Sequence, residues 1–533
     1  MSTRSNQTIL LTSALILAGG VAYYVSRPSS HHEPSISNSA QFSAPTQQNA
    51  LAEKNLSAPP ARSSASKSTI TEVPPHALAN ERIIRFNNEA DYLKFLASLD
   101  ARSLRLLGRS DRLRAVRIGL GSGSNLDGID GAKIGYNYLV TLPTPPNASA
   151  QASATGFGSS VLSWLGVKGD NLSWGEGITV AVIDSGVNEH IALKGNITRI
   201  ELTELSEGSS QLGHGTAVAS IISGDHPLTQ GVAPDSDILS IRITDETGSS
   251  NSFTLAEAIF QAVDAGADII NISMGSEGNS TMVEEAVLYA KEQGTVIVAA
   301  AGNNGLNQIS FPAGYESVIS VGAVEQGGKH LDFSNSGPTL DISAPGYQIN
   351  AAWGSEQLTA FSGTSGSAPL VSGAIAAGMS QYPNLSASEV ADLVVQLSGD
   401  AGYPGSDPNY GNGILDLGQL MNYGTPGIYD AAITGQVLVA PEFPTGLPEV
   451  WVTIQNQGTE TLINSPVTIT TSAGIKNLNI SSLAPGDIQT FNIPVLLPHN
   501  GDPITLSSSV QSAEQDQDPS NNSRSDQFSR EAP

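Results

Sequence analysis

Mostly apolar runs alternate with amphipathic stretches through the middle of this 533-residue chain. The runs lie at residues 178–183, 238–243, 269–273, 296–300 and 318–324, and the amphipathic stretches at 216–223, 255–265 and 281–293. Buried strands that alternate with helices indicate a parallel sheet covered on both faces. We therefore predict an α/β fold with a doubly wound parallel sheet, whose functional residues gather at the carboxyl ends of the strands.

The composition excludes several classes of protein. The chain has no cysteine, which rules out disulfides, thiolate metal sites and a cysteine nucleophile. It holds 24 Lys or Arg against 50 Asp or Glu, a formal net charge of −26. So acidic a chain repels nucleic acid and anionic lipid, and we expect neither as a partner.

The N-terminal segment has the pattern of an export signal. Arg4 precedes an uncharged stretch at residues 9–25, which is typical of a signal peptide or a signal anchor. We assign residues 1–27 to this signal and expect a secreted protein, extracellular or periplasmic; the alternative is tethering to the membrane by the same segment. Residues 28–79 are rich in Ser, Ala, Pro, Gln and Asn without an apolar period, which predicts a disordered linker.

A small α+β domain is predicted at residues 80–150. Strand-like segments at 82–86 and 136–142 enclose apolar residues at helical spacing, which predict two short helices: Tyr92, Phe95, Leu96, Leu99, Leu104 and Leu107. Residues 82–117 hold nine Lys or Arg and four Asp or Glu, a net charge of +5. Residues 151–425 hold six Lys or Arg and twenty-nine Asp or Glu, a net charge of −23. This opposition of charge favours docking of the small domain on the larger one.

Three segments of the α/β region place chemically active side chains beside glycines. Asp184 ends the run at 178–183, His214 lies between two glycines at the start of a predicted helix, and Ser365 starts another. An imidazole held by a carboxylate can take the proton of a hydroxyl as that hydroxyl attacks an amide. Asn303 follows the run at 296–300, and its amide can stabilise an oxyanion together with the Ser365 backbone N–H.

These segments resemble the subtilisin-like serine proteases, or subtilases, over roughly residues 155–422. The carriers are VAVIDSGV around Asp184, GHGTAVAS around His214, AAAGNNG around Asn303 and GTSGSAPLVSG around Ser365. The resemblance implies a subtilisin-like peptidase domain at residues 151–424. It implies a serine-type endopeptidase that hydrolyses peptide bonds of proteins through an acyl-enzyme, with Asp184, His214, Ser365 and Asn303 as its catalytic residues.

The same resemblance places the substrate as an added β-strand. It implies binding along Ser273, Met274 and Gly275, and along a segment near residues 248–250. The first side-chain pocket would then be floored by Gly275, Ala300, Ala301 and Gly302, with Ser310 or Phe311 at one wall. Such a floor favours apolar side chains, and Glu277 nearby offers the alternative of a basic one.

The resemblance also bears on cofactors and partners. Residues 225–230 form a shorter loop than the one that holds calcium in many subtilases, so we expect no metal and no cofactor, with weaker calcium sites left open. The domain at 80–150 lies where subtilases carry an inhibitory propeptide. We expect a zymogen whose own propeptide is an intramolecular inhibitor, cut off between residues 144 and 158, and a monomeric enzyme that acts on proteins or peptides.

Residues 425–533 read as an all-β sandwich, with strand-like segments at 450–455, 467–471, 490–495 and 505–510. They resemble bacterial adhesion modules of the CARDB type in the segments VWVT, NQG, LAPG and DPSNN. This resemblance leaves an alternative function, a surface-binding or adhesion protein whose peptidase domain is vestigial. No member of the predicted triad is missing from the sequence, which favours the peptidase.

Overall fold

The computed structural model describes residues 73–144, 146, 154–206, 212–440, 447–498 and 502–529. The chain divides into two compact units, Met1–Ile70 and Thr71–Pro533, and all described residues belong to the second. The predicted signal at 1–27 and most of the linker at 28–79 lie outside them. In the part that is described, no helix has the length and apolar character needed to cross a membrane.

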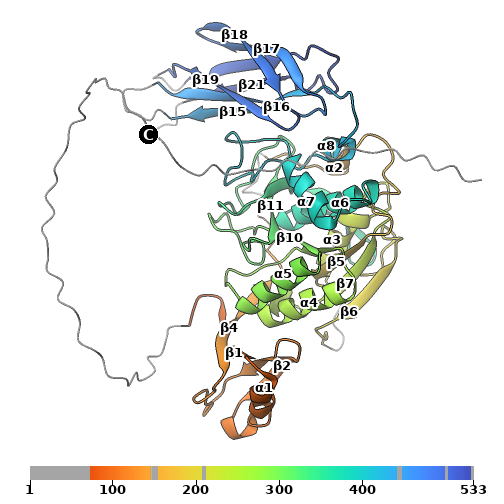
Figure 1. Cartoon of the computed structure of the whole chain (residues 1–533), viewed down its shortest axis with the longest axis vertical. Coiled ribbons are helices and arrows are strands. Elements are labelled where there is room, and N and C mark those ends of the chain that lie inside the picture. Colours follow the sequence, from red (N-terminus) through yellow and green to blue (C-terminus); the bar gives the residue numbers. More distant parts are fainter. Residues whose placement is uncertain are drawn as a thin grey trace, which may run out of the picture. The chain divides into compact units, whose positions relative to one another are not determined.

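A seven-stranded sheet with the order β12-β11-β10-β9-β5-β7-β6 forms the centre of the largest domain (Figure 1). Every neighbouring pair in it is parallel. Its strands are β5 (Thr179–Asp184), β6 (Ile197–Glu201), β7 (Asp237–Arg242), β9 (Ile269–Ile272), β10 (Val296–Ala300), β11 (Val318–Val324) and β12 (Ile342–Pro345). The predicted doubly wound parallel sheet is confirmed.

Helices cover both faces of this sheet because its strands are apolar on both sides. Along β5, Val180 and Val182 face the cluster that holds α3 (His214–Ser223) and α6 (Thr364–Gln381). Ala181 and Ile183 face the cluster that holds α4 (Ser252–Asp264) and α5 (Thr281–Glu292). This alternation within one strand builds two cores around a single sheet.

Shorter elements complete this domain. They are α2 (Val161–Trp164), β8 (Ser249–Asn251), the hairpin of β13 (Ile349–Trp353) and β14 (Gln357–Phe361), α7 (Ala387–Gln396) and α8 (Leu417–Asn422). The chain builds β5, β6 and β7 on one side and then crosses to β9, β10, β11 and β12 on the other. The carboxyl ends of β5 and β9 therefore meet where the direction of winding reverses, which is where α/β sheets bind ligands.

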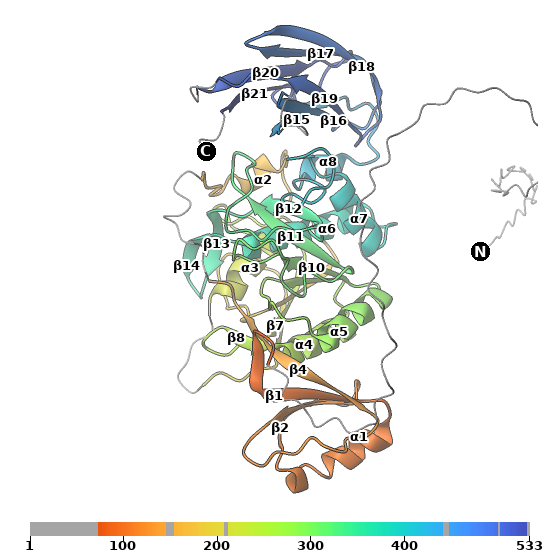
Figure 2. The same cartoon turned by 90° about the vertical axis from the view of Figure 1, so that its left-hand side faces the viewer.

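An antiparallel sheet with the order β2-β3-β1-β4-β8 is formed by four strands that precede this domain and by β8 of the domain itself. Its elements are β1 (Ala77–Phe86), α1 (Glu89–Leu96), a 3₁₀ turn (Asp100–Arg102), β2 (Arg105–Ser110), β3 (Ala115–Gly119) and β4 (Ala132–Thr141). Figure 2 shows α1 against one face of this sheet, where Tyr92 and Phe95 pack on Phe86.

The prediction of a second helix in this unit is wrong for the residues after Arg102. Leu107, which we expected at helical spacing, lies in β2, and only a 3₁₀ turn forms before it. Pairing of β2 with β3 satisfies the backbone hydrogen-bonding groups of this segment. Tertiary contact therefore outweighs the spacing of its apolar residues, which also suits a helix. β1 begins at Ala77, within the range predicted as linker.

The C-terminal region forms two antiparallel sheets with the orders β15-β16-β19 and β18-β17-β20-β21. The strands are β15 (Ala431–Val439), β16 (Glu449–Asn456), β17 (Leu462–Thr471), β18 (Gly474–Leu483), β19 (Ile488–Pro494), β20 (Ile504–Val510) and β21 (Ser523–Phe528). Apolar side chains from both sheets share one core, among them Val452, Val467 and Leu506. The predicted all-β sandwich is confirmed.

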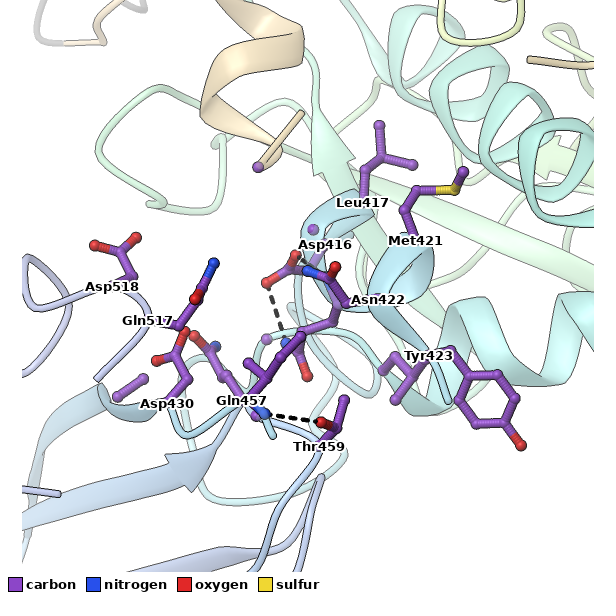
Figure 3. Close-up of a pocket in the computed structure, with 18 of the residues that line it drawn as sticks. Asp416, Leu417, Met421, Asn422, Tyr423, Asp430, Gln457, Thr459, Gln517 and Asp518 are labelled. Carbon is purple, nitrogen blue, oxygen red and sulfur yellow. Dashed lines mark hydrogen bonds between the residues drawn. The ribbon is translucent and has the colours of Figure 1, made fainter. Parts of the chain in front are cut away.

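Carboxylates gather between the β-sandwich and the segments around α7 and α8. Asp416, Asp430 and Asp518 line a cavity of about 1110 Å³ there (Figure 3). Asp430 accepts a hydrogen bond from Asn521 Nδ2 at 2.8 Å. Burial raises the pKa of Asp430 to about 7, and burial does the same to the pKa of Asp400, whose backbone N–H donates to Gln455 Oε1 of β16.

We predict that stability falls as the pH rises because of these two carboxyls. The pKa of an aspartate is about 3.9 when the chain is unfolded, so between pH 4 and about 7 the folded state binds protons that the unfolded state releases. The contribution of these two carboxyls to the free energy of unfolding then falls across that range and levels off above it. In a Ser365→Ala background, chosen because the sequence analysis expects Ser365 to be a protease nucleophile, thermal melting should occur at a higher temperature at pH 5 than at pH 8.

The variant Asp430→Asn tests this prediction, because an amide resembles the protonated carboxyl. It should show a smaller fall in melting temperature from pH 5 to pH 8 than the parent. Asp392→Asn, at an exposed position of α7, is the matched control and should keep the full fall. An unchanged fall in Asp430→Asn would contradict the prediction.

Candidate active site

A buried carboxylate and an imidazole face each other at the carboxyl edge of the sheet. Asp184 is the last residue of β5 and His214 the first residue of α3. The His214 Nδ1 atom lies 2.9 Å from Asp184 Oδ1 and 3.0 Å from Oδ2. Asp184 Oδ1 also accepts the Ser185 N–H at 2.7 Å, so the carboxylate is held and the imidazole is oriented by it.

Glycine at position 215 allows this approach. A Cβ atom there would collide with the Gly186 carbonyl oxygen and would lie 3.2 Å from Asp184 Oδ1. On the other side of the imidazole, the Phe361 ring lies edge-on with its centroid 5.1 Å away. Sequence reasoning missed Phe361, because a single aromatic residue at the end of a hairpin strand carries no local signal of such a contact.

Ser365 is the second residue of α6, which starts with backbone N–H groups that lack helical partners. Its hydroxyl donates to the Ser273 carbonyl oxygen at 2.9 Å. In the described part of the chain, no hydrogen bond joins this hydroxyl to the His214 ring, and the Ser365 N–H has no protein acceptor. The hydroxyl would therefore have to rotate away from Ser273 before it could donate to the imidazole.

Asn303, which follows β10, has its amide orientation set by Thr364. Its Oδ1 atom accepts the Thr364 N–H at 2.9 Å and the Thr364 hydroxyl at 2.8 Å. The Nδ2 atom, the donor end of the amide, is therefore turned away from Thr364. Gly363 has φ of 130°, and a Cβ there would lie 2.7 Å from Nδ2, so glycine is required both for the turn and for this close packing.

A buried polar chain ties α6 to β9. The Ser372 hydroxyl donates to Asn271 Oδ1 at 2.9 Å, and Asn271 Nδ2 donates to the Ser273 hydroxyl at 2.9 Å. That hydroxyl in turn donates to the Ser365 carbonyl oxygen at 3.1 Å. Each buried polar atom is thus satisfied, and the start of α6 is positioned relative to the strand that leads to Ser273.

A small cavity adjoins these groups, and most residues predicted for the substrate line it. Ser273, Met274, Gly275, Ala300, Gly302 and Ser310 contribute to its wall together with Asn303 and Thr364. Ala301 instead belongs to the core under the sheet. Phe311 packs against Tyr315, with the two rings tilted and their centroids 4.8 Å apart. Of the two candidate wall residues, Ser310 is therefore the one that lines the cavity.

The end of β4 lies along this cavity as an added strand. Thr141 exchanges two backbone hydrogen bonds with Gly275, at 3.1 and 3.3 Å. On its other edge β4 pairs with β8, and the Leu142 N–H donates to the Gly248 carbonyl oxygen at 3.0 Å. The N-terminal unit therefore pairs with both segments that the sequence analysis proposed for substrate.

Metal-binding groups are sparse in the described ranges. No three His, Asp or Glu side chains there are arranged to hold a metal ion. The expectation about calcium stays a prediction.

Comparisons with known proteins show what this chain is similar to. A family model described as "Subtilase family" matches residues 175–413. The thermostable alkaline protease of Halalkalibacterium halodurans is 35% identical over 250 residues, which cover 46% of this chain and 68% of that protein. Subtilisin DY of Bacillus licheniformis is 36% identical over 250 residues, 46% of this chain and 90% of that protein. Among solved structures, the prenylagaramide maturation protease PagA is 31% identical, with 50% of this chain and 99% of that chain covered and a TM-score of 0.43.

Proposed function

Because the chain belongs to the subtilase family and is a serine-type endopeptidase, we propose that Ser365 is its nucleophile, with His214 as the base and Asp184 as the orienting carboxylate. The observation that carries this assignment is the buried Asp184–His214 pair at 2.9 Å, at the same sheet edge as the start of α6. A carboxylate held against Nδ1 leaves Nε2 as the proton acceptor.

The reaction then follows from the positions of these groups. The Ser365 hydroxyl turns from the Ser273 carbonyl to the imidazole, gives its proton to His214 and forms a bond to the carbonyl carbon of the peptide. The negative oxygen of the tetrahedral intermediate accepts hydrogen bonds from Asn303 Nδ2 and the Ser365 N–H. His214 returns the proton to the leaving amine as the C–N bond breaks, which leaves an acyl-enzyme. Water, activated by the same imidazole, hydrolyses it.

Labelling with a fluorophosphonate tests the assignment of the nucleophile. The activated wild-type enzyme should be labelled on Ser365, as read by mass spectrometry of its peptides. Ser365→Ala should be neither labelled nor active, because it has no hydroxyl to attack phosphorus or a peptide carbonyl. Absence of label on the wild-type protein would instead favour the adhesion protein with a vestigial peptidase domain.

Replacement of Asn303 by alanine should lower kcat and leave KM nearly unchanged, because the amide acts on the oxyanion and not on the bound substrate. In subtilisin, the reference case for such a donor, its removal lowers kcat by about 10²–10³-fold. Steady-state hydrolysis of a fluorogenic peptide measures both constants. The matched control is Asn304→Ala, whose side chain bonds Glu277 and should change kcat far less.

The N-terminal unit, residues 73–144, is proposed as an intramolecular inhibitor, which makes the full chain a zymogen. The support is its β4, which occupies both edges where a substrate strand would pair. Asn137 Oδ1 also accepts the Ser252 hydroxyl at 2.9 Å and the Phe253 N–H at 3.1 Å, so the unit caps the start of α4.

Arg112 is one cationic anchor of this unit. It pairs with Asp264 at 2.5 Å and lies 5.2 Å from the Phe260 ring centroid and 4.9 Å from that of Tyr289. A second arginine, Arg85, pairs with Glu285. These contacts agree with the opposite net charges of the two domains.

A peptide of residues 73–144 added to the activated enzyme should inhibit it at low salt. Arg112→Ala in that peptide should weaken inhibition about fivefold, because an exposed ion pair and a cation–π contact together contribute about 1 kcal/mol. Arg109→Ala, whose ion pair with Asp111 stays within the unit, is the control and should inhibit as the parent does. The inhibition constant is the measurement. Failure of the parent peptide to inhibit would remove the proposal.

We further propose export by residues 1–27, so that the mature enzyme acts outside the cytoplasm on protein or peptide substrates as a monomer. Tethering by the same residues is the alternative outcome. Mass spectrometry of the Ser365→Ala chain, which should keep its propeptide, reads whether residues 1–27 have been removed and so distinguishes the two.

A further inference from the structure

One carboxylate lines the substrate cavity. The only titratable side chains among the described residues of its lining are Glu277 and His76, and neither Lys nor Arg is among them. Glu277 Oε1 accepts Asn304 Nδ2 at 3.3 Å, and Glu277 Oε2 lies 2.8 Å from His76 Nε2. The Glu277 side chain is 37% exposed, although Asn304 contacts one of its carboxylate oxygens and His76 the other.

His76 comes from the unit that occupies the cleft. Its φ is 61°, in the left-handed region that non-glycine residues rarely adopt. The Leu139 N–H donates to its carbonyl oxygen at 3.0 Å, so this conformation is attached to the strand that lies in the cleft. Strained backbone is often retained at functional sites. Here it orients the imidazole of His76 toward the Glu277 carboxylate.

The side chains of β4 alternate between two faces. Val140 is fully buried, whereas Leu139 and Thr141 point to the other face and line the cavity that contains Glu277. A substrate strand in the same place would therefore put the side chain at the Thr141 position on the face that borders the cavity containing Glu277. Glu277 lies two residues after Gly275, the partner of Thr141.

The register identifies this substrate residue. Thr141, the last residue of β4, pairs with Gly275 in antiparallel fashion. If the pairing continues, the position two residues later, that of Pro143, lies opposite Ser273. The Ser365 hydroxyl is 2.9 Å from the Ser273 carbonyl oxygen, so the residue opposite Ser273 is the one whose carbonyl Ser365 would attack. The residue that pairs with Gly275 is then the third before the cleaved bond.

We propose that Glu277 gives the enzyme a preference for lysine or arginine at the third residue before the cleaved bond. This inference rests on the proposed function, in which the cleft holds substrate as a strand. Removal of the N-terminal unit removes His76, the contact of Glu277 Oε2. This oxygen can then pair with a positively charged side chain of the substrate. Because the site is partly exposed, the attraction is weakened by salt.

A set of fluorogenic peptides tests this preference on the activated enzyme obtained from the full chain. The peptides share one neutral sequence, and a single lysine replaces methionine at each position in turn. At low salt, kcat/KM should be about tenfold higher with lysine at the third position before the cleaved bond than with methionine there. The ratio should fall toward one in Glu277→Gln and in high salt. Glu284→Gln, an exposed glutamate of α5, is the control and should keep the wild-type ratio.

The outcomes separate the two proposals. Cleavage of the neutral peptide with no preference for lysine at the third position overturns this inference and leaves the peptidase intact. A lysine preference directly before the cleaved bond, or one that persists in Glu277→Gln, overturns it as well. If no peptide is cleaved and the fluorophosphonate labels nothing, the proposed function fails and this inference fails with it.

Discussion

Strand β5 is apolar on both faces, and the site depends on how that strand is buried. Val180 and Val182 pack into one core and Ala181 and Ile183 into the other, so β5 cannot shift by one residue without turning each side chain to the wrong core. The strand ends in Asp184, which brings a carboxylate to a fixed point at the edge of the sheet. The other functional groups are placed relative to that point.

Close backbone approach then brings the remaining groups together. Three segments far apart in sequence meet there, at the start of α3, after β10 and at the start of α6, and glycine lets them pack without a Cβ between them. The Asn303 amide is held by two bonds from Thr364, and the Ser365 carbonyl by a buried chain of hydroxyl and amide groups. Preorganised groups of this kind need little rearrangement when charge develops on a substrate.

The N-terminal unit makes the pairing that a substrate would make, and this single contact links the proposed inhibition to the proposed specificity. Main-chain hydrogen bonds to Gly275 and Gly248 hold the end of β4 and Leu142 without regard to their side chains, whereas the contact of His76 with Glu277 is made by the side chains themselves. A strand added to an exposed edge thus receives its affinity from the backbone and its selectivity from the few side chains that face the pocket.

The sequence by itself was sufficient for the parallel sheet, the sandwich and the family, because burial on two faces and alternation of apolar residues are local patterns. It also predicted which polar residues end the strands, from Asp184 to Asn303. Only the tertiary structure decided that Leu107 lies in a strand, that Ser365 donates to the Ser273 carbonyl, and that His76 meets Glu277. Those facts depend on strand register and on contacts between residues distant in the chain. Neither can be predicted from the local pattern of apolar and polar residues.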